Sequence, residues 1–286
     1  MPEKLKSEDS FQLNLENFLI FLDNLITPMR DFEQFNHTHL GMDHLVFKKG
    51  HGPAVIIMHE LPGMIVECVD FADRIEKEGF TVYLPLLFGK PDIQISMIDT
   101  INFTSNLCIS KEFYLFSSNK TSPIVEWLRS LCRLAHGECG YIGVGAIGMC
   151  LTGGFAIPLM VEPSLMAPVL SQPSLPISPL DRSSIACSDE DFQFACKRSK
   201  SENIPILGFK FSNDILSSND KFQLLKFNLG DLFQGAIIDS SPGNKYNIPI
   251  YSHSVFTAHY NDSPGHPTRE AFEKLVNFYK ERLIKN

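Results

Sequence analysis

Concentrated positive charge is the first feature that the sequence lacks. No run of lysine and arginine exceeds a few residues, and the 33 acidic residues outnumber the 25 basic ones to give a formal net charge of −8. Nucleic-acid phosphates require clustered positive charge for binding. We therefore expect no nucleic-acid partner. The negative charge also does nothing to attract anionic substrates, so a substrate carboxylate would need local arginines.

A long apolar run is also missing. The N-terminal residues MPEKLKSEDS are polar, and the most apolar early stretch, residues 18–26, includes Asp23 and Asn24. A membrane-spanning helix needs about 20 consecutive apolar residues, and a secretory signal needs an apolar core. We therefore expect a soluble protein with no membrane partner.

Paired cysteine motifs are the third absence. The seven cysteines are an odd number, include no close CxxC pair, and lie in stretches predicted to be core or helix. Disulfide frameworks and zinc sites both depend on regular cysteine spacing. We therefore expect neither a disulfide framework nor a metal site, and we expect a reducing, cytoplasmic location.

Neither internal repeats nor long linkers divide the chain. Residues 1–40 are predicted to be an N-terminal arm with one amphipathic helix at 15–25, where leucine and phenylalanine recur at three- and four-residue steps. Residues 41–286 are predicted to form one domain. The acidic composition and the lack of an apolar stripe outside the predicted core favour a monomer.

Strands and helices are predicted to alternate from residue 54 to the C-terminus. The run AVIIM at 54–58 is apolar at every position, as expected for a strand buried on both faces of a parallel sheet. The pattern predicts an α/β fold with a doubly wound, mostly parallel sheet flanked by helices. The Pro- and Ser-rich stretch at 162–181 breaks the alternation and is predicted to be an irregular loop. The predicted strands are 43–47, 54–58, 80–85, 141–147, 204–211 and 254–260, and the predicted helices are 69–78, 124–135, one starting at 153, 219–227 and 268–284.

The sharpest chemical signal is the segment AIGMCLTGG at 146–154. A buried strand runs into a Gly-x-Cys turn, and a Gly-rich helix start follows. This is the pattern of a nucleophile elbow, which presents one side chain at the carboxyl edge of the sheet. A thiol at a helix N-terminus ionises more readily, and the Leu151 amide would supply half of an oxyanion hole. The alternative is that Cys150 is a small buried apolar residue, as most free cysteines are.

The order of residues along the chain favours a catalytic role for Cys150. An α/β-hydrolase supplies a nucleophile, then an acid, then a histidine, each from a loop at the same sheet edge. Asp214 follows the strand predicted at 204–211, and His266 follows the strand predicted at 254–260. All three residues are therefore expected at one edge of the sheet.

The acid and the histidine each have an alternative. Asp214 could be an ordinary turn acid or a helix cap, and Asp220 is its rival at the start of the next predicted helix. His266 could cap the final helix. His253 and His259 lie before and within the last predicted strand, so they are predicted to be structural or to line the site. His266 is preferred over His259 because the triad histidine belongs on the loop after the last strand.

The pair His59-Glu60 directly follows the first fully apolar strand, and Glu60 precedes a Leu-Pro-Gly turn. The ordinary interpretation is a strand-end acid in a salt bridge. The functional interpretation is a carboxylate beside the Cys150 thiol that modulates its protonation, with the amide of Leu61 as the second oxyanion donor.

With these motifs in this order, the chain resembles the dienelactone hydrolase family of α/β-hydrolases. The resemblance covers residues 42–284 and is carried by HELPG at 59–63, GFTVYLP at 79–85 with LFG at 87–89, GMC at 148–150, FSND at 211–214 and GHPT at 265–268.

The resemblance implies a role for six residues. They are the nucleophile Cys150, the general base His266, its orienting acid Asp214, the thiol-deprotonating Glu60, and the oxyanion-hole amides of Leu61 and Leu151. The implied reaction is acyl transfer, in which the thiolate attacks the carbonyl of a small-molecule ester or lactone and water then frees the acyl group. The resemblance implies a hydrolase of carboxylic ester bonds that needs no metal or organic cofactor.

Two features depart from the family pattern. Thr152 stands where the usual Gly-x-Cys-x-Gly has its second glycine, so the turn is expected to be looser. Members that cleave dienelactones hold the substrate carboxylate with arginines, and the basic residue close to His266 in sequence is Arg269. Arg269 is therefore the candidate substrate-binding residue, and the identity of the substrate stays open.

Three classes of function are compatible with these residues. The leading hypothesis is a cysteine-dependent hydrolase of esters or lactones. A thioesterase or broad carboxylesterase on the same fold is the second, and a non-catalytic binding protein is the third. Retention of a cysteine, an acid and a histidine in order argues against the third, because a decayed site would have lost one of them.

Overall fold

The computed structural model describes residues 29, 31–89, 91–93, 113, 119–176 and 183–284. The amphipathic helix predicted at 15–25 lies outside these residues. Across the described ranges, no helix is both long and apolar enough to cross a membrane.

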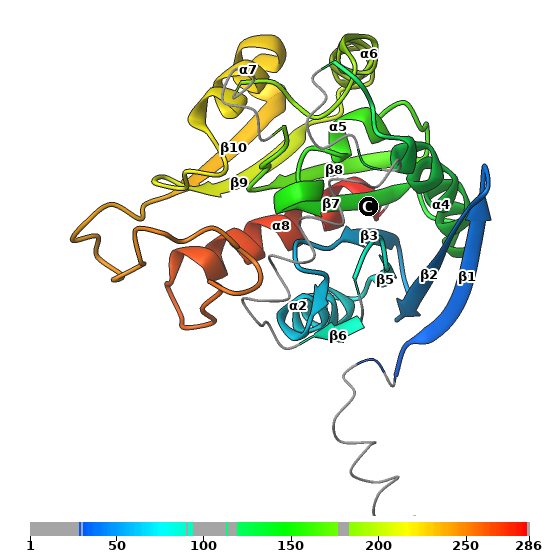
Figure 1. Cartoon of the computed structure of the whole chain (residues 1–286), viewed down its shortest axis with the longest axis horizontal. Coiled ribbons are helices and arrows are strands. Elements are labelled where there is room, and N and C mark those ends of the chain that lie inside the picture. Colours follow the sequence, from blue (N-terminus) through cyan, green and yellow to red (C-terminus); the bar gives the residue numbers. More distant parts are fainter. Residues whose placement is uncertain are drawn as a thin grey trace, which may run out of the picture.

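An eight-stranded sheet forms the centre of the molecule, in the order β1-β2-β5-β3-β7-β8-β9-β10 (Figure 1). The pairs β1–β2 and β2–β5 are antiparallel, and the strands from β5 to β10 are parallel. The predicted doubly wound, mostly parallel sheet is therefore confirmed. Its strands are β1 (Glu33–His39), β2 (Met42–Lys49), β5 (Thr81–Pro85), β3 (Ala54–Met58), β7 (Val144–Met149), β8 (Leu165–Ser171), β9 (Ile206–Phe211) and β10 (Phe233–Ile238). A separate pair contains β4 (Met64–Ile65) and β6 (Pro91–Ile93).

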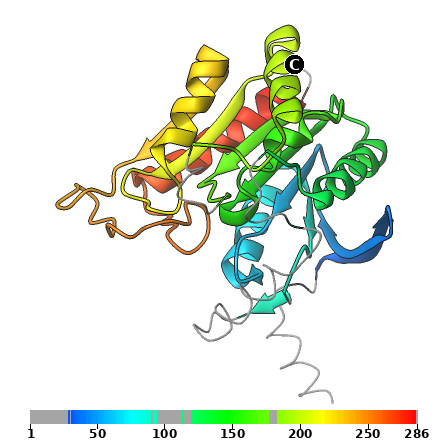
Figure 2. The same ribbon diagram turned by 45° about the horizontal axis from the view of Figure 1, so that its top comes forward.

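Helices cover both faces of the sheet (Figures 1 and 2). One face packs against α2 (Val66–Lys77) and α8 (Pro267–Leu283), and its core includes the fully buried Phe71 and Tyr279. The other face carries the second core, which includes Trp127. Burial of such a side chain contributes roughly 1.5–3 kcal/mol before the entropy of folding is counted. The helices on this second face are α4 (Pro123–Cys139), α5 (Ala156–Leu159), α6 (Asp189–Glu202) and α7 (Asn219–Leu229), with short 3-10 turns η1 (Cys150–Thr152) and η3 (Gly230–Leu232).

The chain changes winding direction between β3 and β7. From β3 the chain passes through α2 to β5 on one side, and after α4 it returns to β7 on the other side of β3. Ligand sites of open α/β sheets lie at such a switch point, beyond the carboxyl ends of the strands. The fold therefore directs attention to the residues that follow β3 and β7.

Three predictions about the strands are wrong. The stretch 162–181, predicted to be an irregular loop, contains β8, whose sequence LMAPVLS is interrupted by a proline but almost wholly buried. The stretch 254–260, predicted to be the last strand, is a series of turns. The last strand is instead β10, at the sheet edge, where a sequence containing Gln234 and Gly235 is partly exposed. In addition, β1 adds a strand within the stretch predicted to be an arm.

Candidate active site

The parallel register of β3 and β7 brings Glu60 and Cys150 together. Met58 pairs with Gly148 across the two strands. Glu60 and Cys150 each lie two residues beyond these partners. The two side chains therefore emerge side by side at the carboxyl edge of the sheet, from the two strands that flank the switch point.

The turn at Cys150 is strained and tightly packed. Cys150 has a φ of +54°, a left-handed conformation that is rare for a residue with a side chain. Its side chain is 8% exposed. A Cβ on Gly148 would lie 2.0 Å from the carbonyl oxygen of Thr152, so only glycine fits there. Backbone strain of this kind concentrates at functional sites, and the geometry agrees with the elbow predicted from the sequence.

Thr152 takes part in the turn through its hydroxyl group. Its Oγ1 accepts a hydrogen bond from the Met149 amide at 3.0 Å and lies 2.9 Å from the carbonyl oxygen of Met58. The side chain is fully buried. The residue that replaces the family glycine therefore connects the turn after β7 to the end of β3, and the turn is not loosened by it.

His253 approaches Cys150 and is held by Asp214. Nδ1 of His253 lies 2.7 Å from Oδ2 of Asp214. Oδ1 of Asp214 accepts hydrogen bonds from the amides of Leu216 at 3.0 Å and Ser217 at 3.2 Å, which orient the carboxylate. A ring nitrogen of His253, the Cys150 sulfur and a Glu60 carboxylate oxygen lie within 4.8 Å of one another.

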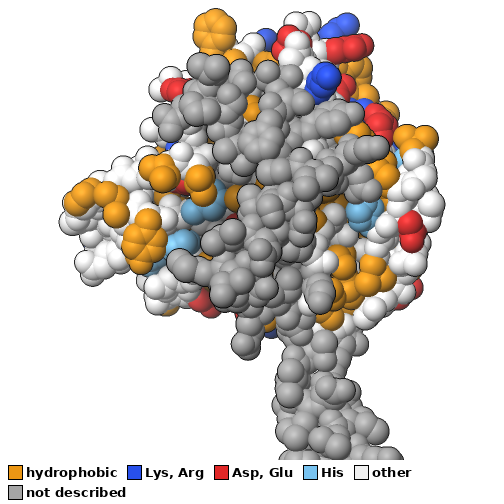
Figure 3. All heavy atoms as spheres, in the orientation of Figure 1, with side chains coloured by type: hydrophobic (Ala, Val, Ile, Leu, Met, Phe, Trp, Pro, Cys, Tyr) orange, Lys and Arg blue, Asp and Glu red, His pale blue; other side chains and the backbone are white. Residues whose placement is uncertain are grey.

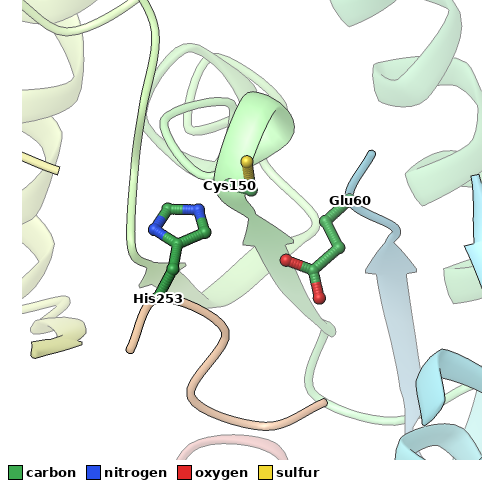
Figure 4. A group of neighbouring side chains, drawn as sticks. All are labelled: Glu60, Cys150 and His253. Atoms are coloured by element: carbon green, nitrogen blue, oxygen red, sulfur yellow. The ribbon is translucent and has the colours of Figure 1, made fainter. Parts of the chain in front are cut away.

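The remaining ring nitrogen of His253 is directed toward Cys150 (Figure 4). Nε2 is buried and has no hydrogen-bond partner among the described residues. Burial lowers the pKa of His253, but the negative charge of the Cys150 thiolate and the hydrogen bond to Asp214 outweigh it and raise the pKa to about 11. An imidazolium held against a thiolate is the ion pair expected of an activated cysteine.

The structure does not bring His266 into this group. Its Nδ1 accepts a hydrogen bond from the Thr268 amide at 3.3 Å, so His266 is the N-cap of α8. This is the capping role that the sequence left open. The last strand was expected at 254–260, but it is β10, and the loop after β10 begins at residue 239 and contains His253. The loop that follows the last strand therefore carries a histidine near the thiol, namely His253.

Glu60 is buried and surrounded by donors. It is 3% exposed, and it accepts hydrogen bonds from Ser254 at 2.7 Å, from Thr257, and from Gln172 at 3.4 Å. These three residues, from the His253 loop and the end of β8, were missed by sequence analysis. Ser254 and Thr257 fall within the strand that was predicted at 254–260, so neither was recognised as a site residue.

Ser174 is a further residue that the sequence did not reveal. Its Oγ lies 3.5 Å from the Cys150 sulfur, and its amide donates to the Cys150 carbonyl at 3.0 Å. It follows β8, whose existence was not predicted. A hydroxyl at this distance from the thiol can stabilise negative charge on sulfur.

The hydrogen bonds of Arg269 are made with residues other than those around the thiol. Its Nε bonds Glu273 at 3.2 Å, and its NH1 donates to the carbonyl of Asp262 at 2.8 Å, both at exposed positions. Leu61 and Leu151 directly follow Glu60 and Cys150, so their amides are at the same sheet edge.

The rim of the site is apolar. Ile215 and Leu216 follow Asp214, and Ile250 and Tyr251 precede His253; the exposed fractions of these four side chains run from 51% to 83%. Figure 3 shows exposed hydrophobic and histidine side chains on this side of the molecule. These four exposed apolar side chains, which flank the acid and the histidine in the chain, are called the rim.

The residue types at the site could serve two kinds of chemistry. A thiol beside an imidazole that a carboxylate orients is the arrangement required for nucleophilic catalysis. The group formed by Glu60, Cys150 and His253 also offers one oxygen, one sulfur and one nitrogen ligand, as a zinc site would. Glu60 already accepts hydrogen bonds from three side chains, which favours the first use.

Comparison with known proteins identifies the family of the chain. A sequence model of the dienelactone hydrolase family matches residues 43–187, just over half of the 286 residues. The match includes Glu60 and Cys150 and stops before the loops that carry Asp214 and His253. No curated protein matches the chain.

Solved structures show the same fold at low sequence identity. A dienelactone hydrolase from Anabaena variabilis ATCC 29413 is 13% identical, with a TM-score of 0.55, and the alignment covers 89% of this chain and 100% of that one. A dienelactone hydrolase-like promiscuous phosphotriesterase from metagenomic libraries is 13% identical, with a TM-score of 0.54 and coverage of 88% and 98%. An esterase from Pyrococcus furiosus is 12% identical, with a TM-score of 0.50 and coverage of 88% and 92%. The fold is that of the α/β-hydrolases.

Proposed function

The chain belongs to the dienelactone hydrolase family, and from this premise we propose that it is a cysteine-dependent hydrolase of small carboxylic esters or lactones. Cys150 is the nucleophile, His253 the general base and Asp214 the acid that orients it. The observation that carries the proposal is the 2.7 Å contact between Asp214 and His253 Nδ1, which leaves Nε2 directed at Cys150.

The proposed reaction has two halves. The Cys150 thiolate attacks the substrate carbonyl, and the amides of Leu61 and Leu151 stabilise the oxyanion. The C–O bond then breaks, the departing alkoxide takes the proton from the His253 imidazolium, and an acyl-enzyme remains. In the second half, neutral His253 takes a proton from water, and the hydroxide adds to the acyl carbon. The carboxylic acid product then leaves and Cys150 is expelled as a thiolate. No step of this proposal passes through a metal.

Glu60 is proposed to modulate the protonation of the Cys150 thiol. Its carboxylate lies within 4.8 Å of the sulfur, close enough to exchange a proton after a small movement. The hydroxyl groups of Ser254 and Thr257 donate hydrogen bonds to this carboxylate. Because both donors follow His253 in the same loop, the carboxylate also fixes the position of that loop.

The proposed substrate is uncharged near its reacting carbonyl. Arg269 is engaged with Glu273 and Asp262, and the exposed side chains beside the acid and the histidine are apolar. A neutral aryl or alkyl ester fits this rim better than an anionic lactone does. Thioesters share this requirement and are the alternative substrate class on the same site.

Two further properties are proposed from the sequence together with the structure. We place the enzyme in the cytoplasm, supported by six free cysteines among the described residues. We expect it to act as a monomer.

The test compares hydrolysis of 4-nitrophenyl acetate, a dienelactone and an acyl thioester by the wild type and by Cys150→Ala. Cys196→Ala, a half-buried cysteine on α6, is the matched control. We expect activity in the wild type and the control, and its loss from a variant whose circular dichroism is unchanged. Equal activity in Cys150→Ala and the wild type would overturn the nucleophile assignment. Absence of activity from all proteins would favour a non-catalytic binding protein.

A further inference from the structure

His259 closes the loop that carries His253. Its Nδ1 lies 3.4 Å from the amide nitrogen of His253 and 3.3 Å from that of Ser254. Its own amide donates to the carbonyl of Ser254 at 3.1 Å. The His259 side chain therefore accepts hydrogen bonds from two consecutive amides, and the His259 backbone bonds the second of these residues, Ser254. These contacts tie residue 259 back to residues 253 and 254 of the same loop.

These contacts fix the protonation state of His259. Both partners are backbone N–H groups, which can only donate, so Nδ1 must carry a lone pair and the ring must be neutral. A protonated ring would place a third donor against two donors, which is repulsive. The half-buried ring is also held between aromatic side chains, with centroids 6.1 Å from Phe211 and 6.2 Å from Tyr251.

We propose that His259 is a positioning residue, whose neutral Nδ1 holds the backbone of His253 and Ser254 so that His253 meets Cys150 and Ser254 meets Glu60. The proposal deepens the proposed function and rests on it. Under this proposal, the conformation of the loop depends on the charge of His259, although His259 does not contact the thiol. Protonation of His259 should release the loop and separate His253 from Cys150.

The charges around His259 favour the neutral ring. Burial and the positive charge of His253 lower the pKa of His259, and Asp214 opposes them. Tyr251 is the other titratable group against the ring, with its ring centroid 6.2 Å from that of His259. Since the pKa of His259 is lowered from 6.5, the ring is neutral at pH 7 and becomes protonated only in mildly acidic solution.

Two substitutions of His259 distinguish the effect of its hydrogen-bond acceptor from the effect of its charge. His259→Asn can place an amide oxygen near the position of Nδ1 and cannot be protonated, whereas His259→Phe keeps a ring between Phe211 and Tyr251 and removes the acceptor. The measurement is the rate of Cys150 alkylation by iodoacetamide from pH 4.5 to 9, followed by peptide mass spectrometry so that other thiols do not contribute. Hydrolysis of 4-nitrophenyl acetate is recorded in parallel.

In the wild type, we expect both rates to fall in acid with a midpoint below pH 6.5. His259→Asn should stay close to the wild-type rate at pH 8 and lose that acidic fall. His259→Phe should be slower by about tenfold at every pH, as expected for the loss of an acceptor shared by two amides. Identical pH profiles for wild type and His259→Asn would overturn the proposal, as would a wild-type rate in His259→Phe.

Alkylation distinguishes this proposal from the proposed function, because it needs no substrate turnover. If no ester is hydrolysed but alkylation follows the expected pattern, the positioning role stands and the enzymatic proposal fails. If hydrolysis depends on Cys150 while alkylation is unaffected by either substitution, the reverse holds. Should His259→Phe not fold, the comparison of wild type with His259→Asn decides alone.

Discussion

Asp214 and His253 are 39 residues apart in the chain, and their side chains meet at 2.7 Å. The acid follows β9, the histidine lies in the loop beyond β10, and the two strands are neighbours in the sheet. The contact therefore depends on the parallel pairing of the last two strands, and it fixes which nitrogen of the imidazole is left for the thiol.

Asp214→Asn should reduce hydrolysis by about 10²–10⁴-fold, the range typical of impaired general acid–base catalysis. The amide cannot stabilise an imidazolium, so the His253 proton is lost more readily. Steady-state rates with 4-nitrophenyl acetate provide the measurement. Asp220→Asn, the rival acid on α7, serves as the control and should retain wild-type rates; an equal loss there would contradict the assignment.

His253→Ala and His266→Ala should have opposite consequences. The first should reduce hydrolysis by about 10²–10⁴-fold with little change in stability, because it removes the base. The second should retain hydrolysis and lower the free energy of unfolding by about 1 kcal/mol, because it removes the side-chain cap of α8. Urea denaturation and initial rates on the same samples separate the two effects. Loss of catalysis in His266→Ala alone would reverse the assignment.

The reactivity of Cys150 should be nearly independent of pH between 7 and 9. Because the Cys150 negative charge and the hydrogen bond to Asp214 outweigh burial and raise the pKa of His253 to about 11, the imidazolium stays protonated and positively charged beside the sulfur as the pH rises through this window. Iodoacetamide alkylation of the wild type should therefore be flat, whereas in His253→Ala it should rise with pH, as for an ordinary thiol with a pKa of about 8.5. A wild type that rises in parallel with the variant would show that no ion pair forms.

Thr152→Val should destabilise the fold by about 1–3 kcal/mol, because the shape is kept while the Met149 amide and the Met58 carbonyl lose their hydroxyl partner. Thr152→Ser, which retains the hydroxyl, should be close to wild type. Urea denaturation gives both values. Equal stability of the valine and serine variants would show that the hydroxyl is not needed.

The sequence allowed the central part of the site to be predicted. Glu60 and Cys150 follow strands that are apolar at nearly every position, and Asp214 follows another, so strand ends could be recognised and placed at one edge. The structure brings Glu60 and Cys150 together, and it places Asp214 against a histidine, although not the expected one.

The remaining part could not be predicted because one strand has a weak signal and one turn region has the composition of a strand. β10 lies at the sheet edge and is half exposed, so it lacks the continuous apolar pattern of an interior strand. In contrast, 254–260 has strand-like composition because Val255 and Phe256 are buried against the α2–α8 face, where Phe256 stacks on Phe71 with centroids 5.3 Å apart. The apolar residues that this burial requires therefore gave a turn region the composition of a strand. The loop after that expected strand contains His266, whereas the loop after β10 contains His253.

The hydroxyl of Thr152 has a consequence for recognising related chains. A glycine at that position is customarily read as a requirement of the turn, yet here a β-branched residue occupies it and anchors the turn to the neighbouring strand. A search that demands glycine two residues after the cysteine would discard this chain. We expect related chains with Thr at that position to anchor the turn to the neighbouring strand in the same way.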